Sequence, residues 1–265
     1  MKCLCITVSA FLLLSFGASC SAFTQQWAEL TMTVVLDGDI PDRQAIVIPA
    51  GVRGPAKIES DVLVVDPTTN GIANIIFMID SKKTKLAASQ LHPDLLNIPE
   101  EKPVLECKEL AFVPHVLAMR TGQTLLVKSA GPNMHNPKFS FFKNDEVGQI
   151  VRPGANREFV TKVEEPGPTK VECSVFPWMS GYVIVASHPY VGISDAKGNI
   201  KIEKLPAGIP LNFKIWHESQ DKSIEELSVG GKKETWKKGA VELTLKEGVN
   251  DLGTVLIKLD RFKSK

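Results

Sequence analysis

The sequence predicts an all-β protein built from β-sandwiches, and three observations support this fold class. Short runs rich in β-branched residues recur along the chain and are separated by turn residues. Helical periodicity is scarce: one short helix is predicted over residues 84–96, where Pro93 limits its length. Gly and Pro are frequent, with 19 and 17 residues, as expected for a chain of strands and turns.

The predicted strands are short and closely spaced along the whole chain. This spacing is typical of β-sandwiches and not of alternating strands and helices. The predicted strands cover residues 30–36, 45–49, 62–65, 72–79, 110–119, 124–128, 157–163, 169–175, 181–187, 192–194, 200–202, 211–216, 241–245 and 253–259.

The composition excludes two classes of protein. The 265 residues are enough for one large or two to three small domains. The 31 Lys and Arg residues balance 30 Asp and Glu residues, whereas a nucleic-acid-binding protein normally carries a basic face, so we expect no nucleic-acid partner. A hydrophobic content of 43% is enough for a packed core and too high for a disordered chain.

The N-terminus has the three-part pattern of an export signal. Lys2 supplies positive charge, an apolar run covers residues 4–16, and small residues cluster over residues 17–22. We expect residues 1–22 to be a signal peptide, because the apolar run is short for a membrane span. Cleavage after Ala22 leaves a soluble protein, whereas cleavage before Cys20 leaves a lipid anchor that tethers the chain to a membrane. Both predict an exported, periplasmic or extracellular protein.

Two segments carry side chains with metal-binding chemistry. Residues 173–182 read Cys-Ser-Val-Phe-Pro-Trp-Met-Ser-Gly-Tyr, and residues 131–137 read Gly-Pro-Asn-Met-His-Asn-Pro. A blue-copper site needs one thiolate, two imidazoles and a weak axial thioether. Thiol, imidazole and thioether side chains are present in these two segments.

A series of motifs in the middle of the chain resembles a known family. The motifs are Phe-Val-Pro-His-Val at 112–116, Gly-Gln-Thr-Leu at 122–125, His-Asn at 135–136, Val-Glu-Cys at 171–173 and Pro-Trp-Met at 177–179. In this order they resemble the secreted cupredoxin-domain proteins that are often labelled plastocyanin-like or methylamine-utilization proteins. The resemblance covers at least residues 104–218 and implies a cupredoxin-like Greek-key sandwich over residues 104–188.

The resemblance also implies a copper site with one ligand missing. His135, Cys173 and Met179 match three ligand positions of the family. Family members place a second His three residues after the Cys, where this chain has Phe176. Either the scaffold has lost its copper and keeps these residues for packing, or a residual copper site uses the three remaining ligands.

The cysteines leave a second alternative open. Cys3 and Cys5 belong to the expected signal peptide, whereas Cys107 and Cys173 remain. In an oxidising compartment these two could form a disulfide. Alternatively, Cys173 is a metal ligand and Cys107 a buried thiol.

The segment after the cupredoxin-like region resembles a different module. It contains Asp195-x-x-Gly198, then Leu-Pro-Ala-Gly at 205–208, then Trp216 and His217. This order resembles the carboxypeptidase regulatory-like (transthyretin-like) β-sandwich. Its first strands are expected before the cupredoxin-like region. We therefore predict one sandwich split between residues 23–103 and 189–265, with three consecutive domains as the alternative.

The motifs favour a non-enzymatic function. The sequence has no glycine-rich phosphate loop, no nucleophile elbow and no His-Glu-x-x-His motif. We expect a binding or structural module of the cell envelope, whose partner is an unknown envelope protein or a redox partner. The rival is a copper-binding or electron-transfer protein. A third interpretation, an accessory domain for carbohydrate or peptidoglycan binding, depends on the sandwich fold and on exposed aromatics such as Trp236.

The remaining histidines are predicted to be structural. Those four are His92, His115, His188 and His217. His217 lies between Trp216 and Glu218, and a hydrogen bond at the surface is its expected role.

Overall fold

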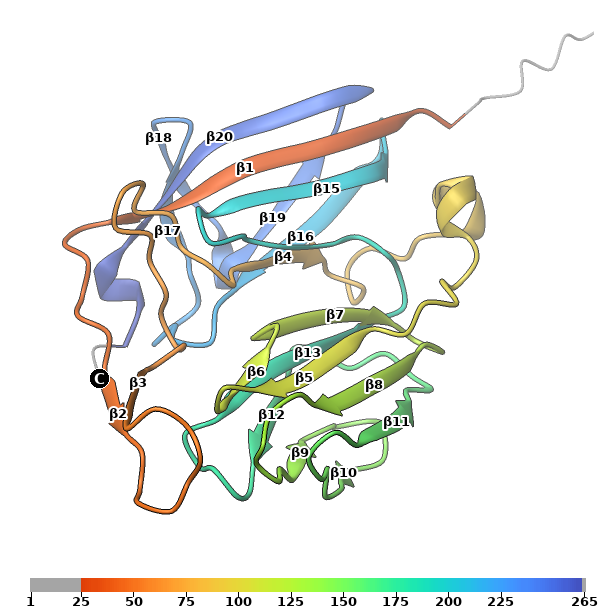
Figure 1. The fold of residues 1–265 in the computed structure, drawn as a ribbon. Helices are drawn as coiled ribbons and strands as arrows, with labels where there is room; N and C mark the ends of the chain where they lie inside the picture. Colours follow the sequence, from red (N-terminus) through yellow and green to blue (C-terminus); the bar gives the residue numbers. More distant parts are fainter. Residues whose placement is uncertain (1–24, 264–265) are drawn as a thin grey trace, which may run out of the picture.

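The structure, a computed structural model, describes residues 25–263 and is nearly all β. The predicted all-β fold class is therefore confirmed. The strands form two sandwiches that lie one above the other in Figure 1, and each has its own hydrophobic core. The expected signal peptide and Cys20 lie outside the described residues. Among residues 25–263, none of the helices is long and apolar enough to cross a membrane.

The first sandwich takes its strands from both ends of the chain. One sheet has the order β15-β1-β20-β17-β18 and the other the order β14-β4-β16-β19. The bounds are β1 (Trp27–Asp37), β4 (Ile76–Ile79), β14 (Val191–Ile193), β15 (Asn199–Pro206), β16 (Pro210–Trp216), β17 (Glu226–Val229), β18 (Lys232–Thr235), β19 (Ala240–Thr244) and β20 (Gly248–Lys258).

Strand β1 shows why this sandwich forms. Every second side chain from Ala28 to Leu36 is buried, so one face of the strand supplies core residues and the other faces outward. β1 pairs antiparallel with β15 and parallel with β20. The turn between β14 and β15 closes beside it, where the Asp195 carboxylate accepts hydrogen bonds from the backbone N–H groups of Lys197 and Asn199.

The second sandwich is built from the middle of the chain. Its sheets have the orders β10-β9-β12-β13-β7 and β11-β8-β5-β6. The bounds are β5 (Val104–Lys108), β6 (Ala111–Val113), β7 (Val116–Arg120), β8 (Thr124–Ser129), β9 (Pro137–Phe139), β10 (Val147–Gly148), β11 (Asn156–Val160), β12 (Thr169–Cys173) and β13 (Ser180–Ala186).

This sandwich mixes parallel and antiparallel neighbours. β5 runs parallel to β8 and β7 runs parallel to β13, whereas the other pairs are antiparallel. The chain changes sheets between β6 and β7 through only Pro114 and His115. The two loops predicted to carry metal ligands follow β8 and β12. The division of the chain into separate folding units at residues 103/104 and 188/189 stays a prediction.

The hairpin of residues 45–59 is not part of either sheet of the first sandwich. β2 (Ala45–Val47) pairs with β3 (Lys57–Glu59) in a separate two-stranded sheet. Ile48 beside this hairpin is buried in the core of the second sandwich, and Ile46 and Ile58 pack against that core. The hairpin extends down to the second sandwich in Figure 1, so residues 45–59 connect the two units.

The helix predicted over residues 84–96 is wrong. The structure has two 3-10 turns there, η1 (Ala88–Gln90) and η2 (Pro93–Leu95). His92, which precedes Pro93, has ψ 138° and so leaves the helical region, because the proline ring disfavours a helical conformation in the preceding residue. Two further 3-10 turns are η3 (Lys237–Gly239) and η4 (Leu259–Arg261).

Candidate metal centre

The backbone holds the two ligand-bearing loops of the second sandwich together. His135 exchanges two backbone hydrogen bonds with Val151, of 3.0 and 2.8 Å. Cys173, the last residue of β12, is paired with Pro137 of β9, and the next N–H, of Ser174, donates to the Asn136 carbonyl at 3.0 Å. The imidazole and the thiol are thus fixed by a strand pair rather than by a free loop.

The structure brings the predicted thiol and imidazole face to face. The distance from Cys173 Sγ to His135 Nδ1 is 3.9 Å, and the two residues are 2% and 1% exposed. Met179, 1% exposed, belongs to the same buried cluster as Cys173. Its loop is tightly closed, since the Met179 N–H donates to the Phe176 carbonyl and the Cys173 N–H donates to the Met179 carbonyl.

Phe176 lies against the imidazole. Its ring meets the His135 ring edge to face with 5.2 Å between centroids, and it also packs on Trp178 at 5.4 Å. At 6% exposure it is part of the core. The phenyl ring offers no lone pair, so it fills the place beside His135 without adding a donor.

Burial sets the protonation of these groups. Desolvation lowers the pKa of His135, because removing a charged imidazolium from water costs free energy. The neutral imidazole, whose lone pair can bind a metal, is therefore favoured. Burial, together with the proximity of Cys173, raises the pKa of the Cys107 thiol to about 12.

The disulfide predicted as an alternative is not formed in the structure. Cys107 and Cys173 are both buried free thiols, and Cys173 Sγ faces His135 Nδ1 instead. Within residues 25–263, His, Cys, Asp and Glu do not gather in a group of three or more that could hold a metal ion. The donor set of this site is one thiol, one imidazole and one thioether.

Two expectations for other side chains are wrong. His217 is 1% exposed, not at the surface, and its Nδ1 lies 2.7 Å from the Ser219 hydroxyl oxygen. Trp236 is 2% exposed and packs 5.7 Å from Phe77 in the first core. The carbohydrate-binding interpretation therefore loses the exposed aromatic on which it depended.

A buried histidine–carboxylate contact joins the two sandwiches, and the sequence did not predict it. His115 Nε2, from the link between β6 and β7, contacts the carboxylate of Glu218, which follows β16. Their side chains are only 8% and 7% exposed. Burial, with Glu218 nearby, raises the pKa of Tyr182 to about 12. No motif marks this pair, because its members are 103 residues apart.

Solved cupredoxins are similar to part of this chain. A purple cupredoxin from Nitrosopumilus maritimus is 20% identical with a TM-score of 0.27, over 31% of this chain and 98% of its own. An amicyanin variant with Cu(I) is 16% identical with a TM-score of 0.28, over 34% and 96%. A copper-containing nitrite reductase from Thermus scotoductus SA-01 is 13% identical with a TM-score of 0.30, over 41% and 26%. No protein-family model and no curated relative matches the sequence.

Proposed function

We propose that this chain is an exported, non-enzymatic binding or structural module of the cell envelope, in which a cupredoxin-like unit has lost its type-1 copper site. The observation that carries the proposal is Phe176, whose ring lies 5.2 Å from the His135 ring at the end of the ligand loop. A type-1 site takes two imidazoles, a thiolate and a weak axial ligand. The donor set of this chain does not fit that copper centre, and we derive no electron-transfer step from it.

The substitution Phe176→His tests this proposal by restoring the missing donor. We expect the variant to develop intense visible thiolate-to-copper absorption when Cu(II) is added. Phe142→His is the matched control, because Phe142 is 80% exposed and its replacement adds an imidazole away from Cys173. A colourless Phe176→His protein that is folded would contradict the idea that one residue separates this site from a blue-copper site.

The second candidate function is binding of Cu(I). It is favoured by the 3.9 Å separation of Cys173 Sγ and His135 Nδ1 and by the buried thioether of Met179. Cu(I) is a soft ion that suits thiolate and thioether ligands. The three side chains would hold the ion, and the buried apolar surroundings would exclude water from it.

Competition with a Cu(I) chelator tests this second candidate. The wild-type protein should take one Cu(I) from the chelator, and Cys173→Ser should lose it. Met179→Leu removes the thioether from the site. Met134→Leu is its control, because Met134 is 44% exposed. Wild-type protein that leaves the chelator loaded, or Cys173→Ser protein that competes as well as wild type, excludes the Cu(I) site.

The location and the domain boundaries belong to the same proposal. The mass of the mature protein distinguishes a chain cut after Ala22 from one acylated at Cys20. Limited proteolysis tests the split sandwich, since β1 pairs with β15 and β20. Release of residues 23–103 as an independently folded fragment would contradict it.

A further inference from the structure

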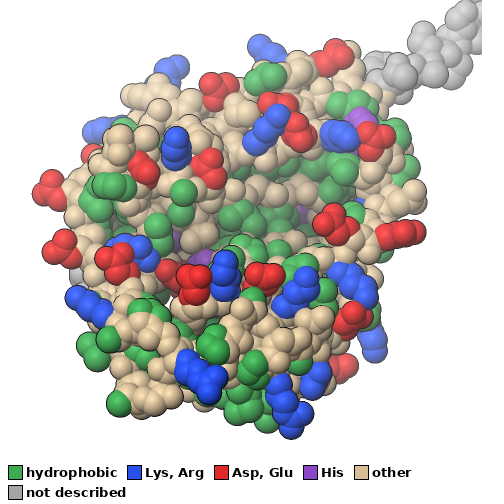
Figure 2. Space-filling view, viewed as in Figure 1, with side chains coloured by type: hydrophobic (Ala, Val, Ile, Leu, Met, Phe, Trp, Pro, Cys, Tyr) green, Lys and Arg blue, Asp and Glu red, His purple; other side chains and the backbone are tan. Residues whose placement is uncertain are grey.

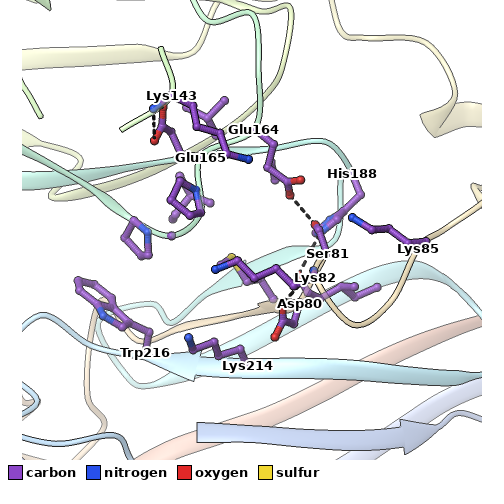
Figure 3. Close-up of a pocket in the computed structure, with 18 residues that line it drawn as sticks. Asp80, Ser81, Lys82, Lys85, Lys143, Glu164, Glu165, His188, Lys214 and Trp216 are labelled. Carbon is purple, nitrogen blue, oxygen red and sulfur yellow. Dashed lines mark hydrogen bonds between the residues drawn. The ribbon is translucent and has the colours of Figure 1, made fainter. Parts of the chain in front are cut away.

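A pocket lies on the boundary between the two sandwiches, away from the candidate metal centre. Its walls come from β4 and the turn after it, from β13, from β16 and from the loop over residues 164–168. The cavity volume is about 130 Å³. Figure 2 shows hydrophobic side chains gathered in the hollow between the two halves of the molecule, and Figure 3 shows the pocket itself.

The floor of the pocket is apolar and well packed. Ile184 and Ala186 of the second sandwich belong to a buried hydrophobic cluster between the sandwiches. Met78 and Trp216 of the first sandwich are partly buried and pack against this cluster. The Trp216 ring is held by an edge-to-face contact with Tyr182, with 4.8 Å between centroids. The pocket therefore offers a fixed aromatic side chain to a ligand.

The carboxylates around the pocket already have partners. Glu165 accepts hydrogen bonds from the backbone N–H groups of residues 142, 143 and 144 at 2.9 to 3.0 Å and from the Asn144 side chain at 2.7 Å. Glu164 accepts from the Ser81 hydroxyl. Asp80 accepts from the Lys82 N–H at 3.0 Å. These hydrogen bonds hold the three carboxylates in place, although they leave the negative charges uncancelled, because every donor is neutral.

The ammonium groups have no such partners. Lys82, Lys85, Lys143 and Lys214 all line the pocket. None of the four takes part in an ion pair among the residues that the structure describes. Figure 3 shows them reaching the pocket from several sides. The lining carries four lysines and three carboxylates, so its formal charge is positive by one. Because no ion pair holds the lysines among the described residues, they can turn toward an anionic ligand.

His188 is a wall of the pocket and not a further cation. Its Nε2 is 3.0 Å from the Ile79 carbonyl oxygen, to which it donates, and its Nδ1 accepts from the Tyr190 N–H. Burial lowers the pKa of His188, so the ring stays neutral. The attraction of the pocket for an anion comes from the lysines.

We propose that this pocket binds a small carboxylate whose body is a ring, with the carboxylate held by the lysines and the ring against Trp216. A neutral ligand would leave the lysine charges unused, and an anion without a ring would leave the apolar floor uncovered. A uronic acid and an aromatic acid share this chemistry. The site includes none of His135, Cys173 and Met179, so its failure leaves the copper proposal untouched.

Titration of the mature protein with D-glucuronate and with benzoate tests the site and distinguishes the two sources. Intrinsic tryptophan fluorescence reports binding, because Trp216 lines the pocket. D-glucose and benzyl alcohol are the matched neutral probes. We expect a saturable response to one of the two acids, none to its neutral partner, and weaker binding at high salt.

Variants locate the response in the pocket. Lys82→Gln combined with Lys214→Gln should weaken binding by about tenfold or more, and Trp216→Phe should remove most of the fluorescence change. Lys232→Gln combined with Lys233→Gln is the control, since both residues are exposed on β18. The proposal is overturned if neither acid saturates, if the neutral probes bind equally well, or if the first double variant binds like wild type.

Discussion

His217 provides a quantitative link between burial and stability. It is 1% exposed, and desolvation lowers its pKa from 6.5 to about 3. The nearby His115 lowers the pKa further, and a hydrogen bond to the Ala73 backbone offsets only part of the shift. The unfolded chain therefore binds a proton at this residue between pH 6.5 and 3, whereas the folded chain does not. Protonation of the unfolded state means that stability is lost as the pH falls through this window.

The size of the effect follows from the two pKa values. One pH unit inside the window is worth about 1.4 kcal/mol for a single group. Lowering the pH from 7 to 5 should thus reduce the free energy of unfolding by about 2 kcal/mol through His217 alone. Burial also lowers the pKa values of His135 and His188, so they contribute in the same direction.

Urea titrations of wild type and His217→Asn at pH 7 and pH 5 isolate this residue. The amide oxygen of Asn can still accept from Ser219, whose N–H donates to His217 Nδ1 in the structure, but Asn does not titrate. We expect the variant to lose about 2 kcal/mol less than wild type between the two pH values. His92→Asn makes the same substitution at a partly exposed histidine and is the control for the replacement itself. Parallel losses in wild type and His217→Asn would refute the depressed pKa.

Two further predictions concern the thiols and a close backbone approach. Cys107 and Cys173 should resist a thiol reagent in the native protein, because they are buried. Both should react after unfolding without reductant, because they are free; no reaction in the unfolded protein would mean a disulfide. Gly198→Ala should destabilise the protein by roughly 3 kcal/mol or more, because φ is +84° and a Cβ would lie 2.1 Å from the Val34 carbonyl oxygen. Gly208→Ala, with φ +77° and open space, should cost only about 1–2 kcal/mol, and equal unfolding midpoints for the two variants would contradict the steric argument.

Local sequence patterns predicted many of the strands, although the strand predicted over residues 62–65 does not form and β5, β9, β17 and β18 were not predicted. The alternation along β1 from Ala28 to Leu36 is visible in the sequence, and it places the buried face correctly. The Asp195-x-x-Gly198 motif forms a turn in which the aspartate carboxylate accepts hydrogen bonds from the backbone N–H groups that follow it. Both signals depend on neighbours in the chain, which is why the sequence carries them.

Features made by distant segments were not predicted. The pocket lysines come from separate segments of the chain, including the turn after β4 and strand β16, and each one alone reads as a surface residue. The sequence does contain a signal for the burial of His217. Leu211, Phe213 and Ile215 are buried in alternation along β16, and the same period of two places His217 on the inner face.

A Cu(II) titration of the purified wild-type mature protein tests directly whether the type-1 copper site has been lost. Because Phe176 packs beside His135, we expect the protein to show no intense visible charge-transfer absorption at one equivalent of Cu(II). A stoichiometric, intensely blue complex would contradict it, because such a complex needs a donor set that Phe176 does not complete.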